Sequence, residues 1–351
     1  MRIVVMPGDD IGPEITEATL LALRAVDRRF ELGLRFEQVD VGMASYRAQG
    51  STLTEAALQA ALRADGVILG PCGMSAYPPR EAGGVNVPGT VRKRLELYAN
   101  LRPARFRNGV PGAREGLDVL IVRENTEGFY ADRNMHAGIA EFMPTPDLAL
   151  SLRKITRQGS RRIAELAFAY AARRRRQVAV VGKRHVLQLG DGLFVGEAEA
   201  VAARQRDTTL REVDVDAMAA DLVTRPQRYD IILTTNMFGD ILSNLAVALS
   251  GGLGLAAALN VGERHAIANA GHGSAPDIAG RGIANPAGLM LSAAMLLEWL
   301  GARHSRPRFA EASRALHEAI DTALADPAAR TTDLGGKGST GSFAEATARL
   351  L

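Results

Sequence analysis

The chain has 351 residues, of which 47% are hydrophobic and 23% are charged, and its formal net charge is +3. This length suffices for one large core or two ordinary ones, and we expect two lobes. The positive charge does not indicate a nucleic-acid surface, because the arginines and lysines are spread along the chain instead of forming a stripe. The one cysteine, Cys72, excludes an internal disulfide framework and favours a reducing compartment.

No stretch of the sequence indicates export or a membrane span. The chain opens on the strand-like run 2–6 instead of a signal peptide's basic and apolar regions, and no segment has about 18 consecutive apolar residues. We therefore expect a soluble, cytoplasmic protein that binds neither membranes nor nucleic acid.

Hydrophobic periodicity predicts alternating strands and helices along much of the chain. The predicted strands are 1–6, 34–41, 66–70, 117–122, 177–182 and 229–235. The predicted helices are 13–26, 54–64, 159–175, 192–205 and 238–250. This alternation is typical of open α/β sheets flanked by helices.

Two glycine-rich stretches do not match phosphate-binding motifs. Residues 8–12, Gly-Asp-Asp-Ile-Gly, follow the first strand but lack the Gly-x-Gly-x-x-Gly spacing, and their acidic pair would repel a pyrophosphate. Residues 335–339 lack the upstream glycine and the strand-to-helix setting of a phosphate loop, so we interpret them as a flexible turn.

The stretch from Arg123 to Tyr130 follows the predicted buried strand 117–122. A guanidinium at a strand's end can bind a carboxylate through two parallel hydrogen bonds, and a phenol can pass a proton to a reacting carbon. The sequence therefore suggests an acid-handling site. An ordinary strand exit with a surface arginine and a half-buried tyrosine fits the same residues.

Three further positions carry candidate chemistry. Arg92 and Arg102 flank the segment 95–100, with a turn expected at 101–103, and could converge with Arg123 on one polyanion; alternatively, each is a surface charge. Lys183 follows a clean apolar strand and could act as a base if desolvation and neighbouring cations lower its pKa. A lysine that simply leaves the sheet for water fits equally well.

Oxygen-bearing side chains suggest a metal site. Asp240 and Asn244 lie four residues apart on the predicted helix 238–250, so they share a face, and with Asp216 they could hold a hard divalent cation. Helix capping by Asp240 is the competing interpretation. Residues 271–280 form a long polar loop rather than a simple turn.

Six motifs along the chain can be considered together. They are Met6-Pro7-Gly8-Asp9, residues 97–103 (Leu-Tyr-Ala-Asn-Leu-Arg-Pro), residues 123–130, residues 238–243 (Phe-Gly-Asp-Ile-Leu-Ser), residues 272–278 and Asp333-Leu334-Gly335-Gly336. Taken together, they resemble those of the β-decarboxylating dehydrogenases, the family of isocitrate, homoisocitrate, 3-isopropylmalate, tartrate and D-malate dehydrogenases. The likeness covers nearly the whole chain, with the motifs in the same order.

This resemblance implies an isopropylmalate-dehydrogenase-like, two-lobed α/β fold with a central cleft, and not a classical Rossmann fold. Residues 1–100 and 250–351 would form a large lobe with the cofactor loop, and residues 101–249 a small lobe with the dimer contacts. The irregular residues 133–150 would belong to an intersubunit clasp. The resemblance also implies a homodimer in which Lys183 and Asp216 are donated across the interface.

The implied activity is NAD-dependent oxidation and β-decarboxylation of a 2-hydroxy acid with Mg2+ or Mn2+. Lys183 would be the base and Tyr130 the proton donor, and the alternative is a catalytically weak regulatory or polyacid-binding subunit. The substrate-binding residues would be Arg92, Arg102, Arg123 and Asn86, with residues 86–90 facing a polar or small substituent. The cofactor-binding residues would be His272, Gly273, Ser274, Ala275, Asp277, Ile278 and Asn285. The metal ligands would be Asp216, Asp240 and Asn244.

Four positions depart from the family pattern. His185 and Asn269 replace an Asn and a Glu usual near nicotinamide, Asn244 replaces a metal-binding Asp, and Asp10 replaces a Gly. These changes bear on metal affinity and nicotinamide geometry, whereas Lys183 and Tyr130 are retained.

Overall fold

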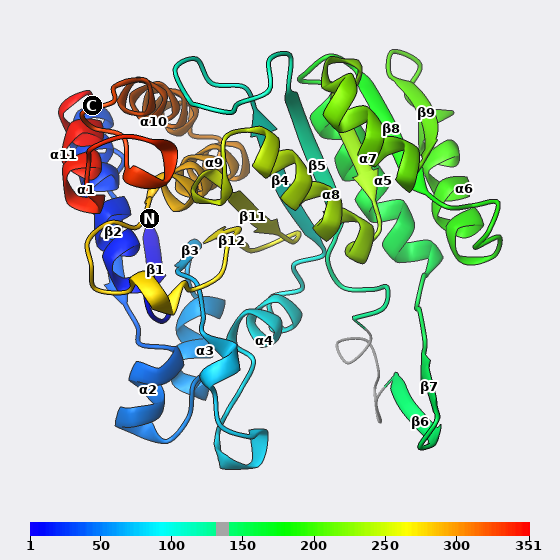
Figure 1. Cartoon of the computed structure of the whole chain (residues 1–351), viewed down its shortest axis with the longest axis horizontal. Helices are drawn as coiled ribbons and strands as arrows, with labels where there is room; N and C mark the ends of the chain where they lie inside the picture. The colour runs from blue at the N-terminus through cyan, green and yellow to red at the C-terminus, as the bar shows by residue number, and fades with distance from the viewer. Residues whose placement is uncertain (131–139) are drawn as a thin grey trace. The chain divides into compact units, whose positions relative to one another are not determined.

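The computed structural model of the chain describes residues 1–130 and 140–351 (Figure 1). These residues form two compact units. Unit 1 comprises Met1–Glu96, Arg107–Ala113 and Ser250–Leu351, and unit 2 comprises Leu97–Phe106 and Arg114–Leu249. The division differs from the expected lobes mainly in the segment Arg107–Ala113, which groups with unit 1.

The sheet of unit 1 combines strands from both ends of the chain. Its order is β2 (Arg35–Gln38), β1 (Arg2–Met6), β3 (Gly66–Leu69), β12 (Ala266–Ala270) and β11 (Ala257–Val261). The pairs β1–β2, β1–β3 and β3–β12 are parallel, and β11–β12 is antiparallel. β3 is buried along its whole length, which agrees with its continuous apolar sequence.

Helices complete the core of unit 1. They are α1 (Gly12–Phe30), α2 (Gly42–Gln49), α3 (Glu55–Leu62), α4 (Val87–Arg94), α9 (Ala287–Arg303), α10 (Pro307–Ala325) and α11 (Thr340–Arg349). Of these helices, the sequence analysis predicted α1 and α3 and did not assign the other five. α9 is buried on nearly every side. No helix within the described ranges is long and apolar enough to cross a membrane.

Both glycine-rich stretches are tightly bonded parts of unit 1. Asp9 is buried and accepts hydrogen bonds from Met43 N (2.7 Å), Gly73 N (3.0 Å) and Tyr77 Oη (2.6 Å). Its carboxylate is therefore bound by donors of the same chain. The turn expected to be flexible at 335–339 is instead constrained, because Thr331 pairs with Gly338 in a β-bridge and the residue after that glycine begins a capping box on α11.

The sheet of unit 2 has the order β4 (Ala99–Arg105), β5 (Asp118–Glu124), β10 (Ile231–Thr234), β8 (Gln177–Gly182) and β9 (Thr209–Asp214). All pairs are parallel except β4–β5. The expected turn at 101–103 is wrong, because these residues lie within β4 and Pro103 pairs with Leu120. The φ of proline is compatible with extended backbone, and burial of Leu101 and Ala104 outweighs the local turn signal.

The helices of unit 2 are α5 (Arg157–Ala171), α6 (Gly190–Ala202), α7 (Val215–Thr224) and α8 (Asn236–Leu249). α7 and α8 supply Met218, Leu222, Leu242 and Ala246 to a core cluster with the β strands. Because α8 begins at Asn236, Asp240 lies in its second turn. The interpretation of Asp240 as a helix cap is therefore wrong.

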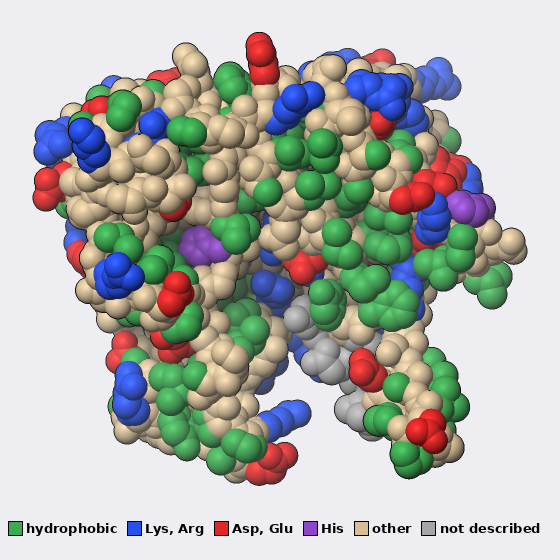
Figure 2. Space-filling view, viewed as in Figure 1, with side chains coloured by type: hydrophobic (Ala, Val, Ile, Leu, Met, Phe, Trp, Pro, Cys, Tyr) green, Lys and Arg blue, Asp and Glu red, His purple; other side chains and the backbone are tan. Residues whose placement is uncertain are grey.

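The described part of the expected clasp is a β-hairpin, whereas we expected residues 133–150 to be irregular. It consists of β6 (Glu141–Thr145) and β7 (Leu148–Ser151), and residues 133–139 lie outside the described residues. Its apolar side chains are exposed, notably Met143 and Leu148, and hydrophobic atoms lie at its surface in Figure 2. A two-stranded hairpin of this kind is marginally stable on its own in water.

Candidate active site

Two buried arginines form the centre of the candidate site in unit 2. Arg123, on β5, is 3% exposed and donates from Nε and Nη2 to Asn236 Oδ1 (3.1 and 2.7 Å) and from Nη1 to Asp240 Oδ1 (2.5 Å). Arg102, on β4, is 6% exposed; its Nη2 lies 3.6 Å from Asp240 Oδ1, and its Nη1 donates to Ser243 Oγ (3.2 Å). The interpretation of these two arginines as surface charges is wrong.

Two positive charges lie close together in this cluster. Arg102 and Arg123 both approach the same carboxylate oxygen, Asp240 Oδ1. Burial, and next the like charge of Arg123, lower the pKa of Arg102 to about 10. Two buried guanidiniums of this kind are suited to bind an incoming carboxylate through parallel hydrogen bonds.

Tyr130 lies beside this cluster. The Arg123 guanidinium carbon is 5.9 Å from the centroid of the Tyr130 ring. The intervening backbone is held by the buried Glu124, which accepts hydrogen bonds from Thr126 N, Thr126 Oγ1 (2.6 Å) and Glu127 N (2.7 Å). Burial raises the pKa of Glu124. The phenol predicted to donate a proton is therefore close to the guanidinium predicted to bind the acid.

Lys183 follows the last residue of β8 and is paired with two carboxylates. Its Nζ donates to Asp216 Oδ1 and to Asp214 Oδ2 (3.3 Å), and His185 Nδ1 lies 3.3 Å from the same Asp214 oxygen. The hydrogen bond to Asp216 raises the pKa of Lys183, and the same bond lowers the pKa of Asp216. In this arrangement Lys183 is a protonated ion-pair partner, so its predicted role as a base would require Asp216 to be engaged elsewhere.

The predicted metal ligands lie on two helices of unit 2. Asp240 and Asn244 lie four residues apart on α8, and Asp216, in the first turn of α7, is paired with Lys183. Within residues 1–130 and 140–351, no group of three or more His, Cys, Asp or Glu side chains could hold a metal ion. Carboxylate and amide oxygens suit a hard divalent cation, but two from one helix leave its coordination incomplete.

Unit 1 contains a cavity of about 370 Å3 at the predicted cofactor loop. Five predicted residues line it: His272, Gly273, Ala275, Ile278 and Asn285. The other lining residues are Ile11, Leu253, Gly254, Ile283, Ala284 and Asp333. Ser274 and Asp277 do not line it; Ser274 is buried and its carbonyl accepts the Ile11 N–H (3.1 Å), and Asp277 is exposed.

The chemistry of this cavity suits an aromatic heterocycle with a few polar atoms. Its walls are largely aliphatic, and His272 contributes a buried Nε2 that has no hydrogen-bond partner among the described residues. Burial lowers the pKa of His272, which favours the neutral ring. Asn285 Nδ2 donates to Asp333 Oδ2 (3.1 Å), so a polar pair lies on the same wall. The unpartnered nitrogen is a candidate contact for a bound nucleotide.

The remaining predicted residues lie in unit 1. Asn86 caps α4 by accepting the Gly89 N–H (2.8 Å), and Arg92 lies in the last turn of the same helix. Asn269, on β12, is hydrogen-bonded to Asn260 and to the Ala270 carbonyl. The roles of Asn86 and Arg92 in substrate binding stay predictions.

Sequence reasoning missed two groups that organise unit 2. Asn236 holds Arg123 with one oxygen, and its position directly after strand β10 was a signal that could have identified it. Arg153 Nη2 lies 2.6 Å from Asp191 Oδ1, and Asp191 Oδ2 accepts the Lys183 N–H (2.6 Å). No local pattern indicates the Arg153–Asp191 ion pair.

The whole chain is similar to known proteins. Residues 2–347 match the model of the family described as isocitrate/isopropylmalate dehydrogenase. The chain is 38% identical over 352 residues to the isocitrate/homoisocitrate dehydrogenase of Thermus thermophilus, covering 100% of this chain and 98% of that protein. It is 40% identical, with the same coverage, to the 3-isopropylmalate dehydrogenase of Methanothermobacter thermautotrophicus. The crystal structure of isocitrate dehydrogenase from Methylococcus capsulatus matches with a TM-score of 0.87 and 36% identity, over 99% of this chain and 98% of that one.

The chain therefore belongs to the isocitrate/isopropylmalate dehydrogenase family. It is an oxidoreductase, a β-decarboxylating dehydrogenase of the isocitrate, homoisocitrate or isopropylmalate type. Such enzymes typically use NAD(P) and a divalent metal. The family and the α/β fold predicted from the sequence motifs are confirmed.

Proposed function

We propose that this enzyme is a cytoplasmic, NAD-dependent and Mg2+- or Mn2+-dependent dehydrogenase of a 2-hydroxy acid with a polar or small substituent. The observation that carries this proposal is the burial of two guanidiniums, Arg102 and Arg123, around the same carboxylate oxygen of Asp240. A polycarboxylic acid could place a carboxylate on these two guanidiniums through parallel hydrogen bonds.

The chain's own residues then have separate tasks. Arg123, which donates a hydrogen bond to Asn236, orients the acid. Tyr130, whose ring lies near the Arg123 guanidinium, protonates the carbon from which CO2 has left. Lys183 accepts the hydroxyl proton once Asp216 has turned away from it. Water exclusion around the two buried guanidiniums strengthens their hold on the developing charge.

We further propose that the active enzyme is a homodimer in which Lys183 and Asp216 act in the partner's site. Two features support this arrangement. In the described part of one chain, Asp240 and Asn244 share one helix while Asp216 is paired with Lys183, and the exposed apolar hairpin β6–β7 is a surface that a second copy would cover.

Asp240, Asn244 and the partner subunit's Asp216 would hold the divalent cation. When bound, this ion supplies Lewis-acid polarisation of the substrate's hydroxyl and carbonyl oxygens. Asn244 brings an oxygen without charge, so we expect weaker metal binding than a third carboxylate would give, with metal entering mainly together with the substrate.

The adenosine half of the cofactor would occupy the cavity at residues 272–285. NAD is preferred over NADP in this proposal, because no lining residue is Lys or Arg and Asp333 lies on the wall, so an added 2′-phosphate would meet negative charge without a cation. We keep Asp277 as a candidate for the ribose hydroxyls, although it does not line the cavity.

The test is a spectrophotometric screen for reduced cofactor with NAD or NADP, Mg2+ or Mn2+, and a panel of 2-hydroxy acids that differ in the substituent facing residues 86–90. We expect turnover of at least one acid with NAD, and loss of turnover in Arg123→Met. Equal or better use of NADP would contradict the coenzyme assignment, and metal-independent turnover would contradict the metal assignment.

A further inference from the structure

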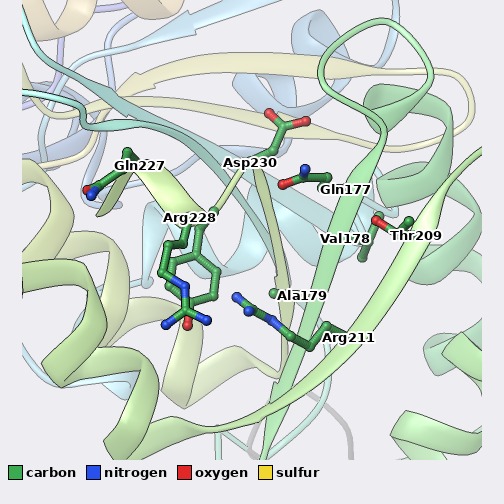
Figure 3. A pocket seen from close by; sticks show the side chains of 9 residues that line it. Gln177, Val178, Ala179, Thr209, Arg211, Gln227, Arg228 and Asp230 are labelled. Carbon is green, nitrogen blue, oxygen red and sulfur yellow. The ribbon is translucent and has the colours of Figure 1, made fainter. Parts of the chain in front are cut away.

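A second cavity, of about 420 Å3, lies in unit 2 at the amino ends of three neighbouring strands (Figure 3). It is lined by the first residues of β8 and β9 and by Tyr229 and Asp230, which directly precede β10. The cavity lining on β8 ends at Ala179, and Lys183 follows the carboxyl end of that strand four residues later, so at roughly 3.3 Å per residue the cavity is about 13 Å from Lys183. This cavity is therefore separate from the candidate active site.

Two arginines of this cavity keep their guanidinium edges available. Arg211 points from β9 toward the cavity, with its guanidinium carbon 4.7 Å from the centroid of the Tyr229 ring. Arg211 has no carboxylate within 4.0 Å in the part of the chain that the structure describes. The nearest carboxylate to Arg228 is Asp221, at 3.8 Å, which is too long for a hydrogen bond. The free edges match the acceptors of a carboxylate or a phosphate.

The acidic groups around the cavity are already neutralised by other partners. Asp230 is buried and accepts hydrogen bonds from Arg174 Nε (2.7 Å) and Arg175 N (2.8 Å). Asp221 accepts from Tyr229 Oη and Arg225 Nη2, each at 2.5 Å. The charges of Arg211 and Arg228 are therefore left to determine the potential inside the cavity.

The rest of the lining suits an organic ligand rather than a bare ion. Ala179 and the Tyr229 ring supply apolar surface, and Thr209 and Gln177 add a hydroxyl and an amide (Figure 3). Ala179 shares its face of the sheet with Arg211, its partner on β9, whereas the side chain of Val178 points to the opposite face. The volume falls in the range of about 300–1,000 Å3 that small-molecule sites occupy. A carbon skeleton can pack on Ala179 and the Tyr229 ring while its anionic group meets the two guanidiniums.

We propose that this cavity is a second binding site for a small organic anion, whose carboxylate or phosphate group is held by Arg211 and Arg228. The site does not depend on the proposed coenzyme, metal or dimer, because all its lining residues belong to one unit of one chain. It gives the enzyme a ligand site on the same strands, β8 and β9, that position Lys183 and Asp214 at their other ends.

The test is methyl NMR of the full-length protein during titration with two probes, inorganic phosphate and succinate, which separate the two sources of anion. We expect a saturable shift of the Ala179 methyl signal, which shares its face of the sheet with Arg211, with at least one probe and a Kd below about 1 mM. Stronger binding of phosphate would indicate a phosphate ester, and stronger binding of succinate a carboxylate. Arg211→Gln should raise the Kd at least about tenfold, because it removes a charged donor.

The matched control is Arg206→Gln, which removes the same charge from an exposed position before β9 that does not line the cavity. It should leave the Kd unchanged. The proposal is overturned if the Ala179 methyl signal does not shift up to about 10 mM of either probe, if Arg211→Gln binds like the wild type, or if Arg206→Gln weakens binding equally. Should Arg211→Gln unfold, as judged by circular dichroism, Arg228→Gln provides the same comparison.

Discussion

Replacing Arg153 by methionine should destabilise unit 2, because it removes the counter-charge of a fully buried carboxylate. Asp191 is 0% exposed, and its Oδ1 lies 2.6 Å from Arg153 Nη2. Arg153 also donates to Thr235 Oγ1 (3.2 Å), and its guanidinium carbon lies 5.7 and 5.5 Å from the ring centroids of Phe129 and Phe238. Methionine keeps an apolar stem for the rings but leaves Asp191 without a cation.

The size of the effect follows from the burial of this pair. Removing one partner of a buried ion pair costs about 3–5 kcal/mol of unfolding free energy. For a unit of this size, a loss of about 3 kcal/mol lowers Tm by about 6–12 °C. Asp191→Asn alone should also destabilise, because it leaves the Arg153 charge buried. The double variant removes both charges, so it should be more stable than the sum of the single effects predicts, by about 2–3 kcal/mol.

Urea denaturation at pH 7, followed by far-UV circular dichroism, measures these differences. The matched control is Arg157→Met, since the Arg157 side chain is 68% exposed and pairs with Glu197; it should change stability by less than about 1 kcal/mol. A loss below about 1 kcal/mol in Arg153→Met would refute the reasoning, as would strict additivity in the double variant.

Three substitutions test the site, and a labelling experiment tests the burial of Cys72. Lys183→Ala should abolish hydride transfer while calorimetry still detects binding of the acid, and wild-type turnover in this variant would exclude Lys183 as the base. Tyr130→Phe should instead slow a step after hydride transfer in single-turnover kinetics. Asn244→Asp should lower the Mg2+ or Mn2+ concentration for half-maximal rate without altering coenzyme preference, whereas an unchanged metal dependence would show that this position does not face the ion. Burial raises the pKa of Cys72 to about 12, so a thiol reagent at pH 8 should label Cys72 far more slowly in the native protein than in the urea-unfolded protein. The labelling rate of the native protein should rise as the pH approaches this pKa and thiolate forms. Rapid labelling of the native protein at pH 8 would contradict this prediction.

The strands β5 and β8 were predictable because each is a continuous apolar run bounded by polar residues. β4 was not, because Pro103 gives a local turn signal that burial of the strand overrides. α9 lacks an amphipathic stripe since it is buried all round, whereas α10 has one and the same periodicity argument could have found it.

In the candidate site, too, some features were predictable from the sequence and others were not. The types of residue at Arg102, Arg123, Tyr130 and Lys183 indicated acid binding and proton transfer from the sequence alone. Their partners were not predictable from local pattern, because Asn236 and Arg123 are 113 positions apart and only the folded sheet brings them together. The Lys183–Asp216 pair was also hidden, since the spacing of 33 residues carries no periodic signal.

The strand order of unit 1 has a consequence for synthesis on the ribosome. β12 pairs with β3, but about two hundred residues separate the two strands in the chain. Unit 2 has all its residues once Leu249 has emerged, whereas unit 1 needs the segment that starts at Ser250. At about 5–20 residues per second, the roughly two hundred residues between β3 and β12 take about 10–40 s to emerge. During that time the edge of β3 that later receives β12 is an unpaired, fully apolar strand, which makes the nascent chain a natural client for a chaperone that shields exposed strands.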